Sequence, residues 1–381
     1  MDTLRAFDFG PVDAIIEQAI RDQVFSGAQL AVGDAGESRY VHSYGRTQRV
    51  PTPGDPIGPD TRFDVASLTK IVATTAVALR LVEAGRLDLD APVLPLLPEL
   101  RGDDAAARAG KDTLSARHLL EHSGGLHWWK PFYEQLDAAA APGEAPRDTL
   151  ARLAAAVPLD APPRTRSVYT DLGFILLATL CERLGGARID ELAARAVWTP
   201  LGMAATTFVD LLPRAPRSWS AVATEICPRR GLVVGEVHDD NAHAAGGVVG
   251  HAGVFSTAED LGRFAAVYAR SWNGERFPGS FPPELARAFA LPAPVPGSTR
   301  SLGWDRPSEG AGASQAGDRW PRVDAVGHGG FTGASMWLDL PRARWLVLLT
   351  NRVHPSRSDE RIKQVRPRVY DAALAALDAA P

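Results

Sequence analysis

Two pairs of predicted strands stand at opposite ends of this 381-residue chain, and they constrain its fold more than any other feature. Residues 29–32 and 38–44 form the first pair, and residues 334–340 and 345–350 form the second. A short turn joins the strands of each pair. We expect the two pairs to combine into one antiparallel sheet that is built from both ends of the chain.

Each strand pair has a predicted helix on its outer side. Before the first pair, the apolar residues at helical spacing are Val12, Ile15, Ile16, Ala19, Ile20 and Val24. After the second pair, Pro367 stands where the first turn of a last helix is expected. The apolar side of that helix would consist of Val369, Ala373, Leu374 and Leu377. The chain therefore begins helix, strand, strand and ends strand, strand, helix.

The middle of the chain shows helical or loop-like patterns, and we find no convincing sheet between residues 75 and 245. The helices expected there cover residues 116–121, 149–156, 172–184 and 189–197. The predicted fold class is α+β, an antiparallel sheet flanked by helices with a large, mainly helical inserted region. Residues 1–74 and 246–381 would make the sheet domain, and residues 75–245 the helical domain.

Composition and charge exclude several classes of protein. A hydrophobic content of 45% supports a large core, and a net charge of -4 with interspersed acids and bases gives no basic stripe for nucleic acid. No uncharged apolar stretch reaches about 18 residues, and the first residues lack the pattern of a signal peptide. We therefore expect a cytoplasmic protein without a membrane segment. Cys181 and Cys227 are too few for a disulfide framework, and the sequence does not indicate an oligomeric state.

The segment 67–70 (SLTK) begins a long apolar run, so a hydroxyl and an amine lie one helical turn apart on one face. Between Asp64 and Arg80 the one charged residue is Lys70. Burial in such a segment would lower the pKa of Lys70 from its usual value of about 10.4. A lysine that is close to neutral can take the proton of Ser67, so this pair indicates a serine nucleophile.

Two later segments have the residue types to complete a site with this pair. Tyr169 lies just outside the predicted N-terminus of an apolar helix, with Asp171 at or near the helix cap. Further along, the segment 327–333 (GHGGFTG) enters the first strand of the closing pair. Its glycines leave room for the backbone or acyl group of a substrate.

Taken in order, residues 67–70, 169–171 and 328–330 resemble the three motifs of the serine β-lactamase and penicillin-binding-protein superfamily. The closest resemblance is to the class C branch, with its family VIII carboxylesterases and D,D-peptidase-like serine hydrolases. Residues 118–126 and 246–260 are also similar to segments of that branch, as are Leu302-Gly303-Trp304 and the closing strand pair. The resemblance therefore covers nearly the whole chain.

This resemblance implies a role for each motif residue. Ser67 would attack an acyl carbonyl to form an acyl-enzyme, which water then hydrolyses. Lys70 and Tyr169 would carry the proton, and the sequence leaves open which of them is the general base. The backbone amides of Ser67 and Phe331 would bind the oxyanion. The other substrate contacts implied by the motifs are His328, Gly329, Gly330 and Asp171. No cofactor or metal is implied.

Two departures from the usual motifs bear on the substrate, which we expect to be a small ester or amide. Asp171 stands where Asn is frequent, and His328 stands where a lysine is frequent, so a permanent cation is missing. An anionic substrate would meet repulsion there. We therefore expect a carboxylesterase acting on short-chain neutral esters. The alternatives are a class C-like β-lactamase and a D-alanyl-D-alanine carboxypeptidase, and histidine at this position also occurs among D,D-peptidases.

Other interpretations of the same residues stay open. His118, Glu121 and His122 match the inverted pattern of zinc proteases, although Ser123-Gly124-Gly125 follows at once. A binding protein on the same fold, without catalysis, is a further alternative. The aromatic residues that we expect to line an acyl pocket are Trp128, Trp129 and Trp304, with packing in the core as the competing explanation.

Overall fold

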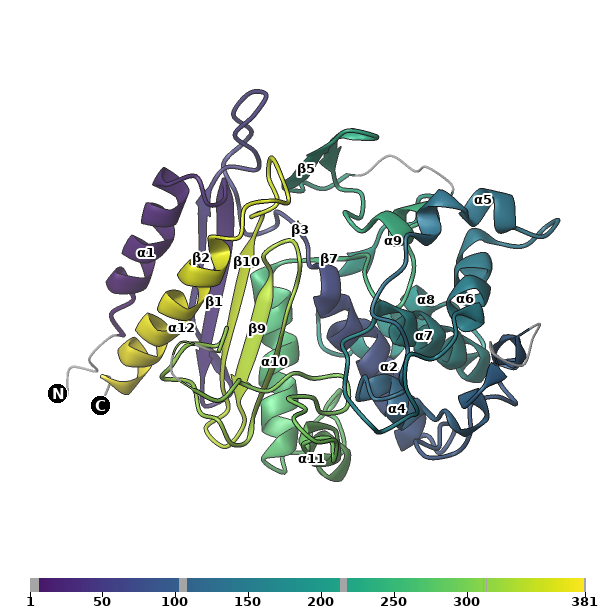
Figure 1. Ribbon diagram of the computed structural model, residues 1–381. Helices are drawn as coiled ribbons and strands as arrows, with labels where there is room; N and C mark the ends of the chain where they lie inside the picture. Colours follow the sequence, from purple (N-terminus) through teal and green to yellow (C-terminus); the bar gives the residue numbers. More distant parts are fainter. Residues whose placement is uncertain (1–6, 103–107, 213–217, 311, 313, 380–381) are drawn as a thin grey trace.

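The computed structural model describes residues 7–102, 108–212, 218–310, 312 and 314–379. Its largest sheet has five strands in the order β2-β1-β10-β9-β8, and every neighbouring pair is antiparallel (Figure 1). The strands are β1 Gly27–Asp34, β2 Glu37–Gly45, β8 Ala325–Gly329, β9 Ser335–Asp339 and β10 Arg344–Thr350. Because β1 pairs with β10, both chain ends contribute to one sheet, and this prediction is confirmed.

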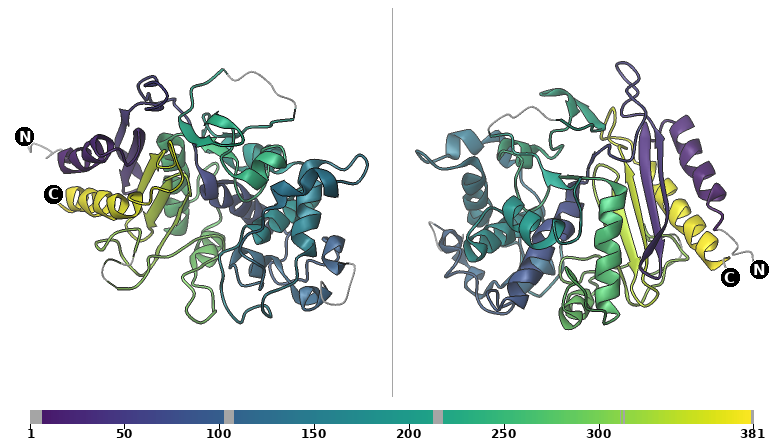
Figure 2. Two further views of the ribbon diagram at one scale, coloured as in Figure 1. Left: turned by 45° about the horizontal axis from the view of Figure 1, so that its top comes forward. Right: turned by 180° about the vertical axis from the view of Figure 1, so that it is seen from behind.

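Helices cover both faces of this sheet. The two terminal helices, α1 (Gly10–Arg21) and α12 (Ile362–Asp378), lie side by side on one face, and α10 (Ala258–Trp272) lies on the other (Figures 1 and 2). Along β1, Leu30 packs into the core under the terminal helices, whereas Ala31 packs into the core on the opposite side. The strand is therefore apolar on both faces, as strands between two helical layers are.

A mainly helical region lies beyond α10 (Figure 1). Besides α1, α10 and α12, the α-helices of the described chain are α2 Ala76–Glu83, α4 Ala116–Leu120, α5 Leu136–Ala139, α6 Pro146–Ala156, α7 Asp171–Gly185, α8 Ile189–Ala193, α9 Asp240–Ala244 and α11 Pro283–Ala290. Helix α7 is apolar almost all round and contacts α2, α4, α6 and α8. It is thus the centre of this region. The exact division of the chain into two domains stays a prediction.

Short strands within residues 75–245 correct the expectation that this segment holds no sheet. They are β4 Thr207–Phe208, β5 Ala223–Cys227 and β6 Gly231–Val234. Strands β5 and β6 form a hairpin, and β4 joins β3 (Phe63–Asp64) and β7 (Val254–Ser256) in a small sheet with the order β3-β7-β4. Runs of two to five residues are too short for an alternating pattern to be recognised in the sequence.

Helix α12 begins earlier than predicted, so Pro367 lies inside it rather than in its first turn. A proline inside a helix has no N–H for the carbonyl four residues earlier, which here belongs to Lys363. The side chain of Gln315 donates to that carbonyl over 3.4 Å. The partner that replaces the missing N–H comes from a distant part of the chain, so the sequence pattern gave no sign of it.

Candidate active site

Ser67 follows a residue with a strained backbone. It lies in the 3-10 helix Ala66–Leu68, and Ala66 has a φ of 47°, a conformation that residues with a side chain rarely adopt. Buried Asp64 holds this conformation, because its carboxylate accepts from the N–H of Ala66 over 2.8 Å and from that of His238 over 2.7 Å. Such strain is characteristic of residues whose position matters to a site.

Lys70 is completely buried, and its ammonium group has three acceptors. Its Nζ lies 3.0 Å from Ser67 Oγ, 2.9 Å from the carbonyl oxygen of His251 and 2.7 Å from Asp171 Oδ1. Burial lowers the pKa of Lys70, as the sequence predicts, but the charge of Asp171 and the hydrogen bonds outweigh burial, so the net pKa is raised. The expectation of a lysine close to neutral is therefore wrong: its counter-charge comes from α7 and not from its own segment.

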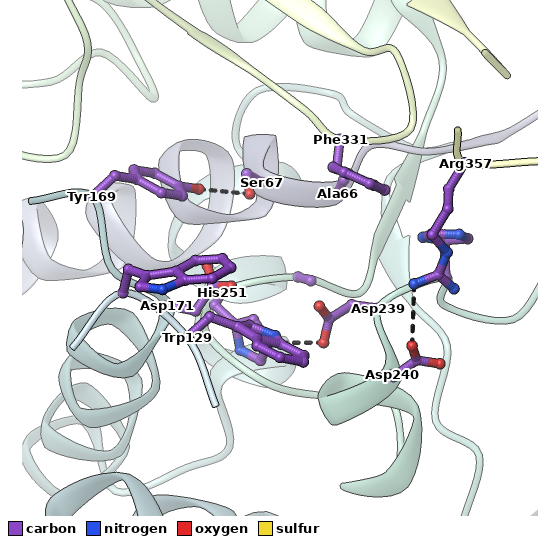
Figure 3. A pocket seen from close by; sticks show the side chains of 13 residues that line it. Ala66, Ser67, Trp129, Tyr169, Asp171, Asp239, Asp240, His251, Phe331 and Arg357 are labelled. Carbon is purple, nitrogen blue, oxygen red and sulfur yellow. Dashed lines mark hydrogen bonds and ion pairs between the residues drawn. The ribbon is translucent and has the colours of Figure 1, made fainter. Parts of the chain in front are cut away.

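Tyr169 also contacts the nucleophile. Its hydroxyl lies 2.7 Å from Ser67 Oγ (Figure 3). The residue stands just before α7, whose N-cap is Thr170 rather than Asp171. The Thr170 hydroxyl accepts from the N–H of Gly173 and donates to the carbonyl of His127 over 2.6 Å. The helix start thus fixes Tyr169 against Ser67 and, one residue into the helix, directs Asp171 toward Lys70.

The third motif is locked against the backbone in front of Ser67. A Cβ on Gly330 would lie 2.5 Å from the carbonyl oxygen of Val65, so only glycine fits there. The hydroxyl of Thr332 donates to the carbonyl of Asp64 over 2.7 Å. This contact brings Phe331 and Ser67 into the walls of the same cavities. This arrangement is compatible with oxyanion binding by the amides of Ser67 and Phe331, and that role stays a prediction.

His328 is buried and neutral. Burial lowers its pKa to about 3. Its Nδ1 lies 2.8 Å from the carbonyl oxygen of Gly329, and because a carbonyl only accepts, Nδ1 carries the proton. Nε2 therefore has a lone pair, and this atom has no hydrogen-bond partner among the described residues. His328 is also one of the residues that line a cavity next to Ser67. His328 can thus accept a hydrogen bond, but it cannot supply a positive charge near neutral pH.

A cavity of about 350 Å³ opens beside Ser67. Its walls include the apolar side chains of Trp128, Trp129 and Phe331. Figure 3 shows Trp129 and Phe331 among the residues that line this space together with Ser67. The carbonyl of Trp128 accepts from the N–H of Asp171, which ties the tryptophan segment to the start of α7. We call this space the aromatic cavity. Trp128 and Trp129 therefore lie where the sequence places an acyl pocket.

Trp304 does not line this cavity, and its assignment to the pocket is wrong. It is only 1% exposed and packs against Tyr268, with ring centroids 4.8 Å apart, and against Phe264. The Gly303 backbone that precedes it lies against Thr75. Trp304 is thus a core residue, which was the alternative interpretation to a position in the pocket.

A second cavity, of about 400 Å³, adjoins Ser67 along the third motif. Sequence reasoning missed the residues that give it its charge, which are Arg300, Arg352, Lys363 and Arg366. We call this space the arginine cavity. The expectation that permanent cations are missing near the third motif is therefore wrong. Arginines are frequent along this chain, and nothing in their local sequence separates these from surface residues.

Comparisons with known proteins agree with this geometry. A sequence model described as Beta-lactamase matches residues 12–369. The chain belongs to the β-lactamase family. It is 31% identical to Esterase EstB of Burkholderia gladioli over 94% of both chains, and 30% identical to an N-acetylmuramyl-L-alanine amidase of Bacillus subtilis over 82% of this chain and 72% of the amidase.

The fold of this β-lactamase family member is also found among solved structures. A simvastatin synthase from Aspergillus terreus superposes over 100% of both chains with a TM-score of 0.73 at 20% identity. The relatives by sequence are hydrolases, so the chain is a serine hydrolase with the β-lactamase fold. None of the helices in its described part combines the length and apolarity that crossing a bilayer requires. The expected cytoplasmic location stays a prediction.

The zinc-protease interpretation does not fit this family member. His118 Nδ1 accepts from the N–H of Ser115 in a capping box at the start of α4, and His122 Nδ1 accepts from the N–H of Thr170. Glu121 accepts from the hydroxyl of Ser123. Both histidines thus use a ring nitrogen to anchor backbone, and the sequence pattern marks the end of a helix.

Another group could offer ligand atoms to a cation, namely Asp171, Asp239 and His251, whose candidate atoms lie within 4.8 Å of one another. Asp171 already pairs with Lys70, and Asp239 Oδ1 lies 3.0 Å from His251 Nε2. Burial raises the pKa of Asp239, but the charge and hydrogen bond of His251 outweigh burial and lower it. The protein's own groups thus engage these carboxylates.

Proposed function

We propose that this serine hydrolase is a carboxylesterase acting on short-chain esters through an acyl-enzyme at Ser67. The observation that carries the proposal is the aromatic cavity, in which Trp128, Trp129 and Phe331 offer an apolar space directly beside the Ser67 hydroxyl. An acyl chain of a few carbons gains free energy there at about 25 cal/mol per Å² of buried apolar surface. The similarity to Esterase EstB over nearly the full length of both chains supports the same activity.

In the proposed mechanism, Tyr169 is the general base. The Nζ of Lys70 donates to three acceptors as an ammonium, so it has no lone pair to take the proton of Ser67. The remaining side chain in contact with Ser67 Oγ is Tyr169. Burial raises the pKa of Tyr169, and the positive charge of Lys70 only partly offsets burial, so the phenol predominates. The base is therefore the fraction of the enzyme in which Tyr169 is a phenolate, and this phenolate takes the proton of Ser67. Tyr169 then returns the proton to the departing alcohol.

The charge of Asp171 does not argue against anionic substrates in this mechanism. Lys70 compensates it at 2.7 Å, so an anion near Ser67 meets an ion pair and not an isolated carboxylate. The aromatic cavity therefore supports ester substrates, whereas repulsion of anionic substrates by Asp171 does not. Arg366 in the arginine cavity favours a second candidate, the hydrolysis of an amide whose leaving group carries a carboxylate. The amidase relative supports this alternative.

A substrate panel on the purified protein tests the proposal. We expect kcat/KM for p-nitrophenyl acetate and butyrate to exceed that for nitrocefin and for a peptide ending in D-Ala-D-Ala. Ser67→Ala provides the background rate for each compound. Turnover of the peptide or nitrocefin in preference to both esters would replace the carboxylesterase proposal with the second candidate or with a β-lactamase.

A further inference from the structure

The arginine cavity contains more positive than negative charge. The acidic and basic residues in its walls, apart from His328, are Arg300, Asp305, Arg352, Glu360, Lys363 and Arg366. Two of the cations have carboxylate partners: Arg300 lies 3.4 Å from Asp305, and Lys363 lies 2.8 Å from Glu360. His328 is neutral there, as shown above. Two positive charges, those of Arg352 and Arg366, are left over.

Neither of these two arginines has a carboxylate within ion-pair distance in the part of the chain that the structure describes. Burial lowers the pKa of Arg352, and the more distant carboxylates of Glu360, Asp359 and Glu225 oppose burial only in part. Arg352 donates to the backbone carbonyls of Phe331, Arg357 and Asp359. Arg366 donates to the side-chain oxygen of Gln315 over 3.3 Å, and its Nε has no partner. Carbonyl and amide oxygens satisfy hydrogen bonds, but they carry no net charge to balance a guanidinium.

Arg366 is the more unusual of the two, because it is only 8% exposed. Burial lowers its pKa, and the nearby charge of Arg352 acts in the same direction, while Tyr370 opposes it. An unpaired cation that is buried to this extent is costly unless an anion reaches it. Arg366 and Gly329 lie next to each other in the wall of the arginine cavity, since a Cβ on Gly329 would lie 3.7 Å from Arg366 Nη1.

Ser67 lines both cavities, and so do Tyr169 and Phe331. If the acyl group of an ester fills the aromatic cavity, the leaving group extends into the arginine cavity from the same carbonyl carbon. Guanidinium groups recognise carboxylates through two parallel hydrogen bonds. We propose that the natural leaving group of this hydrolase carries two carboxylates, one for Arg366 and one for Arg352. This inference rests on the proposed ester hydrolysis and adds the class of leaving group.

A series of acetate esters with one acyl group and increasing leaving-group charge tests the inference. The compounds are phenyl acetate, 4-acetoxybenzoate and 5-acetoxyisophthalate, which carry no, one and two carboxylates. Each kcat/KM is divided by the rate of spontaneous hydrolysis, so that differences in chemical reactivity cancel. We expect the normalised value to rise along the series, with the dicarboxylate more than about tenfold above phenyl acetate. Equal values for the three esters would overturn the inference.

Arg366→Gln identifies the residue responsible. We expect it to lower kcat/KM for the dicarboxylate at least about fivefold more than kcat/KM for phenyl acetate, and so to remove most of the preference. The matched control is Arg276→Gln, which removes an exposed arginine paired with Glu284 and should leave the whole series unchanged. An equal loss on all three esters in Arg366→Gln would show a structural role and contradict the assignment.

A binding measurement separates this inference from the proposed function. Calorimetry on the wild-type protein should give a Kd for isophthalate at least about tenfold below that for benzoate, whether or not any ester is hydrolysed. Failure to hydrolyse phenyl acetate would refute the esterase proposal alone. If benzoate and isophthalate bind equally well, or if neither binds, the dicarboxylate leaving group alone is refuted. This measurement uses only the wild-type protein, so it does not depend on the folding of a variant.

Discussion

At the scale of single residues, the proposed path of the proton depends on the contact between Lys70 and Asp171. A motif with Asn at position 171 would offer Lys70 a hydrogen bond but no negative charge. In the proposed mechanism the carboxylate keeps Lys70 as an ammonium, whose positive charge favours the Tyr169 phenolate that accepts the proton of Ser67. An aspartate in place of the frequent asparagine would thus divide the proton transfer differently between Lys70 and Tyr169.

Asp171→Asn tests this division. Activity in the proposed mechanism requires the Lys70 ammonium, so it is lost as pH rises through the pKa of Lys70. That pKa is raised in the wild type, and loss of the carboxylate lowers it, so the alkaline limb of the pH profile of kcat/KM should move down by at least about one pH unit. A profile whose alkaline limb does not move, or moves upward, would assign the base role to Lys70.

At the scale of secondary-structure elements, α12 contains a proline that the helix itself does not favour. Pro367→Ala should restore an N–H for the carbonyl of Lys363 and raise the free energy of unfolding by about 1 kcal/mol or more. The matched control is Pro283→Ala at the start of α11, where no N–H is needed and little change is expected. Chemical denaturation of both variants measures the difference. A destabilised Pro367→Ala would mean that Gln315 compensates the helix fully.

At the scale of the whole molecule, buried neutral His328 couples stability to pH. Its pKa is about 3 in the folded protein and about 6.5 in an unfolded chain, so below pH 6.5 the unfolded state binds a proton that the folded state refuses. Stability should therefore be unaffected by His328 above about pH 6.5. As pH falls toward 3, stability should decrease by up to about 1.4 kcal/mol per unit.

Denaturation of the wild type and His328→Asn between pH 7 and pH 4 measures this coupling. The variant should show a shallower loss of stability on acidification, because it no longer carries the titrating group. If the ring resonances of His328 titrate near pH 6.5 in NMR spectra of the folded protein, the histidine is not held neutral, and the account of the third motif is wrong.

How much of the molecule the sequence predicted depends on how local the determining contacts are. Strands β1, β2, β9 and β10 carry apolar or alternating patterns of their own, so most of the sheet was predicted. Strand β8 was missed, because its short run Ala325–Gly329 contains two glycines and shows no clear alternation. The charge of Lys70 was mispredicted because Asp171 lies about a hundred residues away. The local sequence does not distinguish Trp304 from Trp128. Only their packing in the structure shows that Trp304 is a core residue and that Trp128 lines the cavity.

The arginine cavity lay beyond prediction for the same reason. Arg300, Arg352 and Arg366 belong to three different segments, and each resembles the many arginines on the surface. They meet because the segment of Arg300 and Asp305 pairs with β8 at Gly327, near the end of β10 and α12. A sequence pattern reports which faces are apolar, whereas the absence of a counter-charge becomes visible only when all neighbours of a side chain are known.

The most direct test of the account as a whole is the identity of the nucleophile. The protein is treated with a fluorophosphonate, its intact mass is measured and the modified peptide is mapped. We predict one phosphonyl group per chain on Ser67, much slower labelling of Tyr169→Phe and no labelling of a folded Ser67→Ala. An adduct on any other residue, or a Ser67→Ala variant that is labelled and hydrolyses esters at the wild-type rate, would contradict the mechanism.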